Sequence, residues 1–68
     1  MARYYVNENE QSNGDHEVHK DGCYWLTLVQ RKKYLGEFVS CVGAVREAKK
    51  YYSTADGCIH CSEACHTS

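Results

Sequence analysis

Residues 57–66 read GCIHCSEACH and place three cysteines and two histidines within ten positions. Within this stretch Cys58 and Cys61 form a C-x2-C pair, a spacing that lets one tight turn direct two thiolates at a single metal ion. The same pair on its own also fits a redox site or a disulfide. The stretch therefore predicts a metal site if a second pair of ligands lies elsewhere in the chain.

A second pair of ligands lies upstream, in the sequence HKDGC at residues 19–23. His19 and Cys23 form an H-x3-C pair at the end of an expected strand. Between Cys23 and Cys58 lie 34 residues, which is room for one strand–helix unit. Two short ligand pairs separated in this way are typical of structural zinc sites. The sequence therefore predicts Zn²⁺ bound by His19, Cys23, Cys58 and Cys61.

Other ligand sets remain open from the sequence alone. Cys65 or His66 in the tail, or His16 on the expected strand, is an alternative to one of the four ligands. With Cys65 in place of His19, four cysteines would suit zinc or an iron–sulfur cluster. A chain without metal, with free thiols, a disulfide or redox chemistry, is a further alternative. Cys41 is expected to be a small buried apolar side chain, since free cysteine packs well.

The size of the chain favours such a cross-link. It has 68 residues, with one Phe and one Trp among its large apolar side chains. A chain of this length buries only about 60% of its unfolded surface. Domains this small usually need a metal, a disulfide or a partner subunit to stay folded. We expect a single domain spanning residues 1–68, held together by the zinc site.

The N-terminal sequence MARYYVNENEQ predicts a cytoplasmic protein, because it lacks the apolar segment of a signal peptide. No apolar run approaches the roughly 20 residues that a membrane span requires, so we expect no membrane partner. Clustered cysteines in a reducing compartment favour metal or redox chemistry over a disulfide framework. The odd number of cysteines, five, agrees with this interpretation.

The order of predicted elements indicates a small α+β fold. Residues 2–6 (ARYYV) and 16–20 (HEVHK) read as strands, and an Asn-Gly pair between them is a strong hairpin-turn signal. Residues 34–39 (YLGEFV) read as a third strand. The stretch GCYWLTLV at residues 22–29 is ambiguous between a turn and a strand.

One helix is predicted over about residues 40–52. Ser40 is a good N-cap, because its hydroxyl accepts from the free N–H groups of the first turn. Apolar side chains then recur at i, i+4, i+7 and i+11 and form one stripe. The members of this stripe are Cys41, Val45, Ala48 and Tyr52. The expected fold is a short antiparallel β-sheet or hairpin plus this helix.

The stretch VHKDGCYWL…YLGEFVSCVGAVREAKKYYSTADGCIHC, within residues 18–61, resembles the metal-binding N-terminal domain of the bacterial Ada DNA-repair protein. It is also similar to small bacterial domains in which a ligand-x3-ligand turn, a Phe-containing segment and a short helix lead into C-x2-C. The resemblance implies that His19, Cys23, Cys58 and Cys61 are the zinc ligands. In the Ada domain the first ligand is a cysteine that accepts a methyl group, and here that position is His19. The tail SEACHTS has no counterpart.

The charge distribution raises a nucleic-acid hypothesis. Net charge is −1, but residues 24–52 carry +4, whereas residues 1–23 carry −3 and residues 53–68 carry −2. A basic patch with tyrosines for base stacking would favour nucleic-acid binding. Its expected members are Arg31, Lys32, Lys33, Arg46, Lys49 and Lys50, with Tyr34, Tyr51 and Tyr52. The partner is thus expected to be a protein or a nucleic acid.

The predicted function is a small structural-zinc binding module without catalysis. A catalytic zinc needs an open coordination position and a general base, and HEVH at residues 16–19 lacks the H-E-x-x-H spacing of a helical site. The alternative is Cys-based redox or Ada-like DNA-repair activity. Thioredoxin-like chemistry needs C-x2-C at a helix N-terminus after a strand. Here the pair is expected to follow a helix instead.

Overall fold

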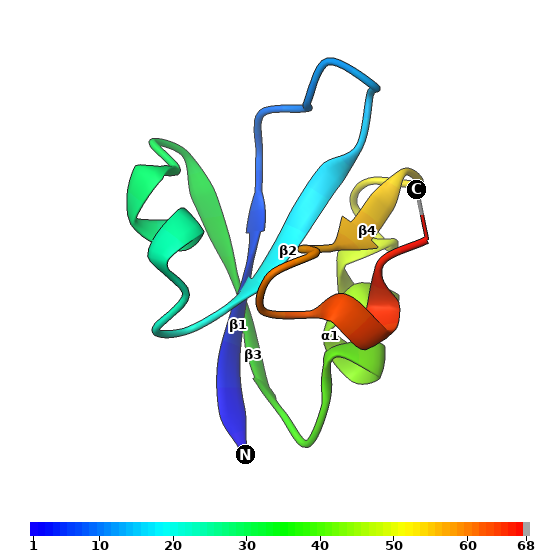
Figure 1. Cartoon of the computed structure of the whole chain (residues 1–68). Coiled ribbons are helices and arrows are strands. Elements are labelled where there is room, and N and C mark those ends of the chain that lie inside the picture. Colours follow the sequence, from blue (N-terminus) through cyan, green and yellow to red (C-terminus); the bar gives the residue numbers. More distant parts are fainter. Residues whose placement is uncertain (68) are drawn as a thin grey trace.

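The computed structural model describes residues 1–67 and consists of a four-stranded sheet with one α-helix on one face (Figure 1). The strands are β1 (Ala2–Asn7), β2 (His16–Lys20), β3 (Lys32–Phe38) and β4 (Ala55–Gly57), in the spatial order β3-β1-β2-β4. The helices are α1 (Cys41–Ala48) and two 3₁₀ helices, η1 (Tyr24–Leu28) and η2 (Glu63–Cys65). This confirms the predicted α+β class with a single α-helix.

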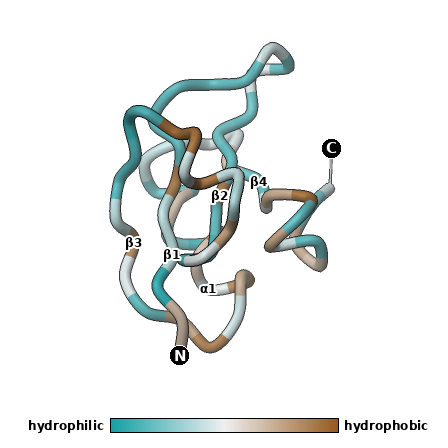
Figure 2. Tube along the Cα trace, turned by 60° about the vertical axis from the view of Figure 1, so that its left-hand side comes forward, coloured by the Kyte–Doolittle hydropathy of each residue, from teal (hydrophilic) through white to brown (hydrophobic). Residues whose placement is uncertain are grey.

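The hairpin of β1 and β2 forms as predicted. The two strands pair antiparallel, with Tyr5 opposite His19 and Val6 opposite Val18. The loop between them is hydrophilic (Figure 2). Gly14 in this loop has φ of 90°, a left-handed conformation that glycine adopts without strain. β1 also pairs antiparallel with β3, which makes it a central strand of the sheet.

The strand β4 was not predicted, because its three residues are too short to show an alternating pattern. The segment before the cysteine cluster was expected only to end the helix. It pairs instead in parallel with β2, placing Ala55 beside His16 and Gly57 beside Val18. The sheet is therefore mixed, and residues 58 onward start at its edge next to β2.

Helix α1 begins as predicted and ends earlier than predicted. The Ser40 hydroxyl accepts from the backbone N–H of Val42, as expected for an N-cap. The helix was predicted to reach residue 52 but ends at Ala48. The Lys50 N–H bonds to the Glu47 carbonyl, an i−3 spacing, so the last turn tightens to 3₁₀ geometry.

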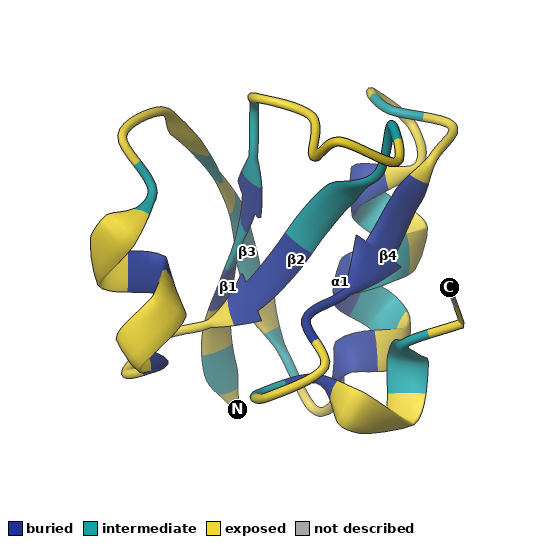
Figure 3. Cartoon of the chain, turned by 45° about the horizontal axis from the view of Figure 1, so that its top comes forward, coloured by how far each residue is buried: buried dark blue, intermediate teal, exposed yellow. Residues whose placement is uncertain are grey.

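The buried side chains form two clusters on opposite faces of the sheet. Figure 3 shows that most of the buried residues belong to the strands, to α1 and to the short helix η1. The larger cluster lies beneath α1 and contains Tyr4, Val6, Val18, Cys41, Ala44, Ala48 and Ala55. The smaller cluster lies against η1 and contains Cys23, Leu26 and Cys58, with Tyr5 and Cys61 packed on it. Successive residues of a strand point to opposite faces, so β1 and β2 supply both clusters.

A disulfide joins Cys41 at the start of α1 to Cys65 in η2. The prediction that Cys41 is an unpaired apolar side chain is therefore wrong, although the residue is buried. The bond forms because the tail folds back over α1 and brings the two Cα atoms within 6.2 Å. Disulfides persist mainly in oxidising compartments, so this bond also speaks against the reducing compartment that the clustered cysteines predicted.

Removing the disulfide should destabilise the domain strongly. The two cysteines lie 24 residues apart in the sequence. Closing a loop of this length restricts the unfolded chain by about 3–4 kcal/mol, so Cys65→Ser should lower the free energy of unfolding by that amount. Denaturant unfolding at constant metal concentration measures it. Ala64→Ser, at an exposed neighbouring position, is the matched control. A loss below about 1 kcal/mol for Cys65→Ser would contradict the pairing.

Candidate metal centre

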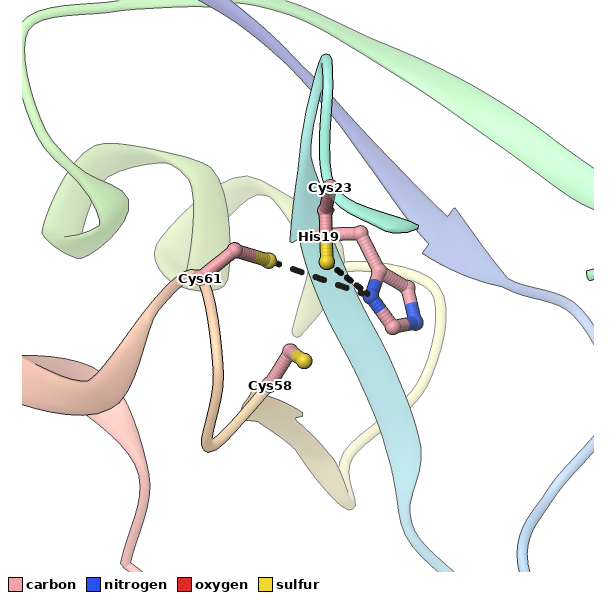
Figure 4. Close-up of side chains that lie close together, drawn as sticks. All are labelled: His19, Cys23, Cys58 and Cys61. Carbon is pink, nitrogen blue, oxygen red and sulfur yellow. Dashed lines mark hydrogen bonds between the residues drawn. The ribbon is translucent and has the colours of Figure 1, made fainter. Parts of the chain in front are cut away.

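Four side chains predicted as ligands meet at one point between the sheet and η1 (Figure 4). The ligand atoms of these residues all lie within 4.8 Å of one another. His19 Nδ1 is 3.9 Å from Cys23 Sγ and 3.9 Å from Cys61 Sγ. The four residues are His19, Cys23, Cys58 and Cys61. They are the four residues that the ligand spacing in the sequence predicts.

The distances fit a tetrahedral ion. With metal–sulfur bonds near 2.3 Å and metal–nitrogen bonds near 2.0–2.1 Å, neighbouring ligand atoms lie about 3.5–3.8 Å apart. Two separations in this cluster are 3.9 Å, and none exceeds 4.8 Å, about 1 Å beyond that range. Small side-chain rotations close such a gap. The cluster can therefore hold a metal ion.

The first ligand pair is placed by the end of β2 and a tight turn. His19 is 1% exposed and lies on the face of the sheet that carries η1. Gly22 has φ of 93° and lets the chain reverse at once. The Cys23 N–H then bonds to the Lys20 carbonyl at 3.1 Å. The turn brings the Cys23 sulfur back to the imidazole, which explains the x3 spacing.

The second ligand pair starts where β4 ends. The Cys58 N–H donates to the Val18 carbonyl at 2.9 Å, which places Cys58 beside β2. The chain then turns, and the Ser62 N–H bonds to the Cys58 carbonyl at 2.8 Å. The Lys20 N–H points at the Cys61 sulfur at 3.3 Å. A backbone donor on sulfur stabilises the thiolate form that a metal ion requires.

Gly57 is needed where the tail passes over this turn. A Cβ atom at position 57 would lie 2.6 Å from the Ser62 carbonyl oxygen and 2.8 Å from Cys65 Cβ. The disulfide fixes Cys65 on one side and the ligand turn fixes Ser62 on the other. Neither group can move easily, so the glycine allows the ligand turn and the disulfide to lie in contact.

Burial and hydrogen bonds shift the pKa values of three residues of the cluster. Burial raises the pKa of the Cys61 thiol to about 12, despite the Lys20 N–H. Burial also raises the pKa of the Cys23 thiol, but hydrogen bonds from Cys61 and backbone N–H groups outweigh it, and the net shift is downward. Burial lowers the pKa of His19, so its imidazole is neutral near pH 7. Without a cation, the Cys61 thiol therefore keeps its proton at neutral pH.

The alternative ligands lie elsewhere. The His16 ring stacks on Tyr52 at a centroid distance of 4.0 Å and its Nδ1 lies 3.0 Å from the Asn7 carbonyl. His66 Nδ1 lies 3.0 Å from the Gly57 carbonyl oxygen. Cys65 is held in the disulfide. None of the three joins the cluster of His19 with three cysteines.

The tyrosines of the expected basic patch do not share one surface. Lys33 Nζ lies 4.6 Å from the centre of the Tyr51 ring, on the side of the sheet that α1 covers. Tyr34 pairs with Tyr5, and their rings lie 5.3 Å apart on the opposite side. Tyr52 is occupied by the stack with His16. The side chains named for nucleic-acid stacking are therefore divided between two faces.

Two features of the centre were not predicted. Glu17 Oε1 lies 3.6 Å from His19 Nε2, the ring nitrogen that faces away from the sulfurs. The i, i+2 spacing on a strand is the signal that could have identified this pair. The Trp25 ring stacks on His60 at 4.9 Å, linking η1 to the turn between Cys58 and Cys61. No local sequence pattern indicates that stack.

No protein-family model matches this sequence, and no curated protein or solved structure shows significant similarity to it. The resemblance to the Ada domain therefore stays a prediction from the sequence pattern. Within residues 1–67, no helix has the length and apolar character to cross a bilayer.

Metal binding should release protons. Because the pKa of Cys61 is about 12 in the metal-free protein, a metal that takes its thiolate must displace that proton. The apparent affinity should then rise at least about tenfold per pH unit between roughly pH 6 and pH 8. Calorimetric titration in two buffers of different ionisation enthalpy counts the protons. An affinity that is flat across this pH range would contradict metal binding by Cys61.

Proposed function

We propose that this chain is a structural-zinc module, in which Zn²⁺ bound by His19, Cys23, Cys58 and Cys61 fixes a surface for a protein partner. The meeting of these four side chains within 4.8 Å carries the proposal. Three thiolates and one imidazole in tetrahedral arrangement are a donor set typical of structural zinc. An iron–sulfur cluster is disfavoured, because it requires a fourth cysteine ligand and Cys65 is in the disulfide.

A structural role is supported by the closed character of the centre. His19 and Cys58 are each 1% exposed, and Cys23 is 9% exposed. Four protein ligands complete a tetrahedral zinc shell and leave no position for a substrate or a water. A catalytic zinc keeps such a position open. The site is therefore better suited to holding segments together than to hydrolysis.

Thiol redox chemistry finds little support. The C-x2-C pair follows strand β4, which corrects the expectation that it follows the helix. Within residues 1–67, however, no α-helix begins at Cys58, whereas redox-active thiols usually lie at a helix N-terminus. Cys58 is buried, and burial raises the pKa of Cys61 to about 12. Cys58 therefore lacks the exposure of a redox-active thiol, and Cys61 lacks its low pKa.

The metal would hold together the face of the sheet that has few other contacts. The buried apolar side chains of the cluster on this face are those of Cys23, Leu26 and Cys58. Structural zinc contributes about 10–16 kcal/mol of apparent binding energy to small domains. That is far more than one buried leucine supplies, about 1.5–3 kcal/mol. The position of η1 is therefore proposed to depend on the ion.

The proposed contact surface is formed by the segments that carry the ligands. Tyr24, Trp25 and Leu28 on η1 are 67%, 44% and 57% exposed. Ile59, between the two cysteines of the second pair, is 48% exposed. Exposed aromatic and aliphatic side chains gathered on one surface favour a protein partner. The division of the tyrosine side chains between two faces makes nucleic acid the weaker candidate.

The first test of this proposal is metal content and metal removal. The purified protein should contain one zinc per chain by plasma emission spectrometry. Chelation should collapse the amide NMR dispersion of residues 19–28 and 57–61, because the ligand pairs are joined across the centre mainly by the ion. Added zinc should restore the spectrum. An unchanged spectrum after confirmed metal loss would refute the structural role.

The second test compares histidines in the same neighbourhood. His19→Ala should abolish stoichiometric zinc binding, whereas His60→Ala should bind zinc like the parent protein, because His60 lies outside the cluster. His19→Cys should retain zinc, since a fourth thiolate suits a structural site. Tetrahedral Co²⁺ spectra report the ligand set directly. Equal zinc loss in the His60 and His19 variants would show that His19 is not a specific ligand.

The third test concerns the Ada resemblance. The parent protein should take up no methyl group from DNA that carries methylphosphotriesters, because the nitrogen of His19 that binds the metal has no lone pair left to act as a nucleophile. Mass spectrometry measures the transfer. A stoichiometric gain of one methyl group on any cysteine of the centre would establish the repair activity instead.

A further inference from the structure

One buried polar atom beside the metal centre has no hydrogen-bond partner among the residues that the structure describes. This atom is His19 Nε2. Buried polar groups in proteins are almost always paired, so an unpaired one needs an explanation. Figure 4 shows that this nitrogen points away from the three sulfurs, whereas Nδ1 points toward them.

The orientation of the ring decides which nitrogen can bind a metal. His19 Nδ1 lies 3.9 Å from both Cys23 Sγ and Cys61 Sγ, so it is the nitrogen available to an ion in the cluster. A neutral imidazole that gives the Nδ1 lone pair to a metal carries its proton on Nε2. The unpaired atom then becomes a buried N–H donor that requires an acceptor.

Glu17 supplies the acceptor. It lies two residues before His19 on β2, so both side chains project from the same face of the sheet. Its Oε1 atom is 3.6 Å from His19 Nε2, and its side chain is only 18% exposed. If the Glu17 carboxylate moves about 0.5 Å toward His19 Nε2, the two atoms reach hydrogen-bond distance.

Within the part of the chain that the structure describes, the hollow beside Glu17 holds no second carboxylate that competes for His19. Glu17 and His19 line an open hollow of about 310 Å³ between β2, η1 and the hairpin loop. Trp25, Leu28 and Val29 form its apolar wall. The remaining lining side chains are the neutral amides of Asn7, Asn9, Gln11 and Gln30. Glu17 is thus the one carboxylate among the residues lining this hollow, and an apolar wall strengthens its attraction for an N–H donor.

We propose that Glu17 is the positioning residue of the metal centre. Its carboxylate accepts the Nε2–H of His19, fixes the imidazole in the tautomer with a free Nδ1, and holds that nitrogen toward the sulfurs. The inference rests on the proposed zinc site and adds to it the residue that orients the nitrogen ligand. Carboxylates that hold a ligating histidine in this way typically contribute about 10–100-fold to metal affinity.

The test measures zinc affinity by competition with a chromophoric chelator. Glu17→Ala should bind zinc about 10–100-fold more weakly than the parent protein. Glu17→Gln should fall between the two, because its amide oxygen still accepts a hydrogen bond but lacks the charge. Glu63→Gln, at an exposed position in η2, removes the same charge without touching His19 and should bind like the parent.

A second readout separates positioning from a general loss of stability. Long-range ¹H–¹⁵N correlation spectra of the zinc-loaded parent should show His19 bound through Nδ1 with a protonated Nε2. The Nε2 proton should exchange slowly in the parent and faster in Glu17→Ala. Unaltered affinity and exchange in Glu17→Ala, or zinc on Nε2, would overturn the role of Glu17 while leaving the zinc site intact. A parent protein that binds no zinc would instead overturn the proposed function.

Discussion

The parallel pairing of β4 with β2 is the interaction on which the rest of the structure depends. It ends in a 2.9 Å hydrogen bond from the Cys58 N–H to the Val18 carbonyl. This contact brings the second ligand pair to the end of the strand that carries the first, across 34 intervening residues. It also fixes where the tail starts its path back to α1. Without this pairing, the chain would not bring the four ligand residues together, nor Cys65 close to Cys41.

Strand β2 divides the molecule into two differently stabilised faces. Val18 points to the cluster beneath α1, where aliphatic side chains and the Cys41–Cys65 disulfide hold the fold. His19 points to the opposite face, where three cysteines surround it and few other apolar side chains are buried. The chain is too short to build two sufficient cores. A covalent cross-link on one face and a metal ion on the other are physically consistent with that limit.

The proposed module follows from the difference between these two cross-links. The disulfide restricts the unfolded chain whether or not a metal is present, whereas the metal centre would order η1 and the turn that contains Ile59. The exposed side chains of Tyr24, Trp25 and Ile59 lie on those two segments. A partner that binds there would therefore recognise the metal-loaded form. Glu17 lies between the metal centre and this surface. It is beside the ligand His19, and it lines the hollow next to Trp25.

Local sequence determined the elements whose signals lie within a few residues. The hairpin, the Ser40 cap, the start of α1 and the four clustered ligands were all predicted, because alternation, capping and ligand spacing are properties of short segments. Only the tertiary structure decided the parallel strand β4, the pairing of Cys41 with Cys65 and the approach of Glu17 to His19 Nε2. These contacts depend on the path of the chain between distant segments. Cysteines 24 residues apart carry no sequence mark of their partner, because it is the folding of the tail over α1 that brings the two sulfurs together.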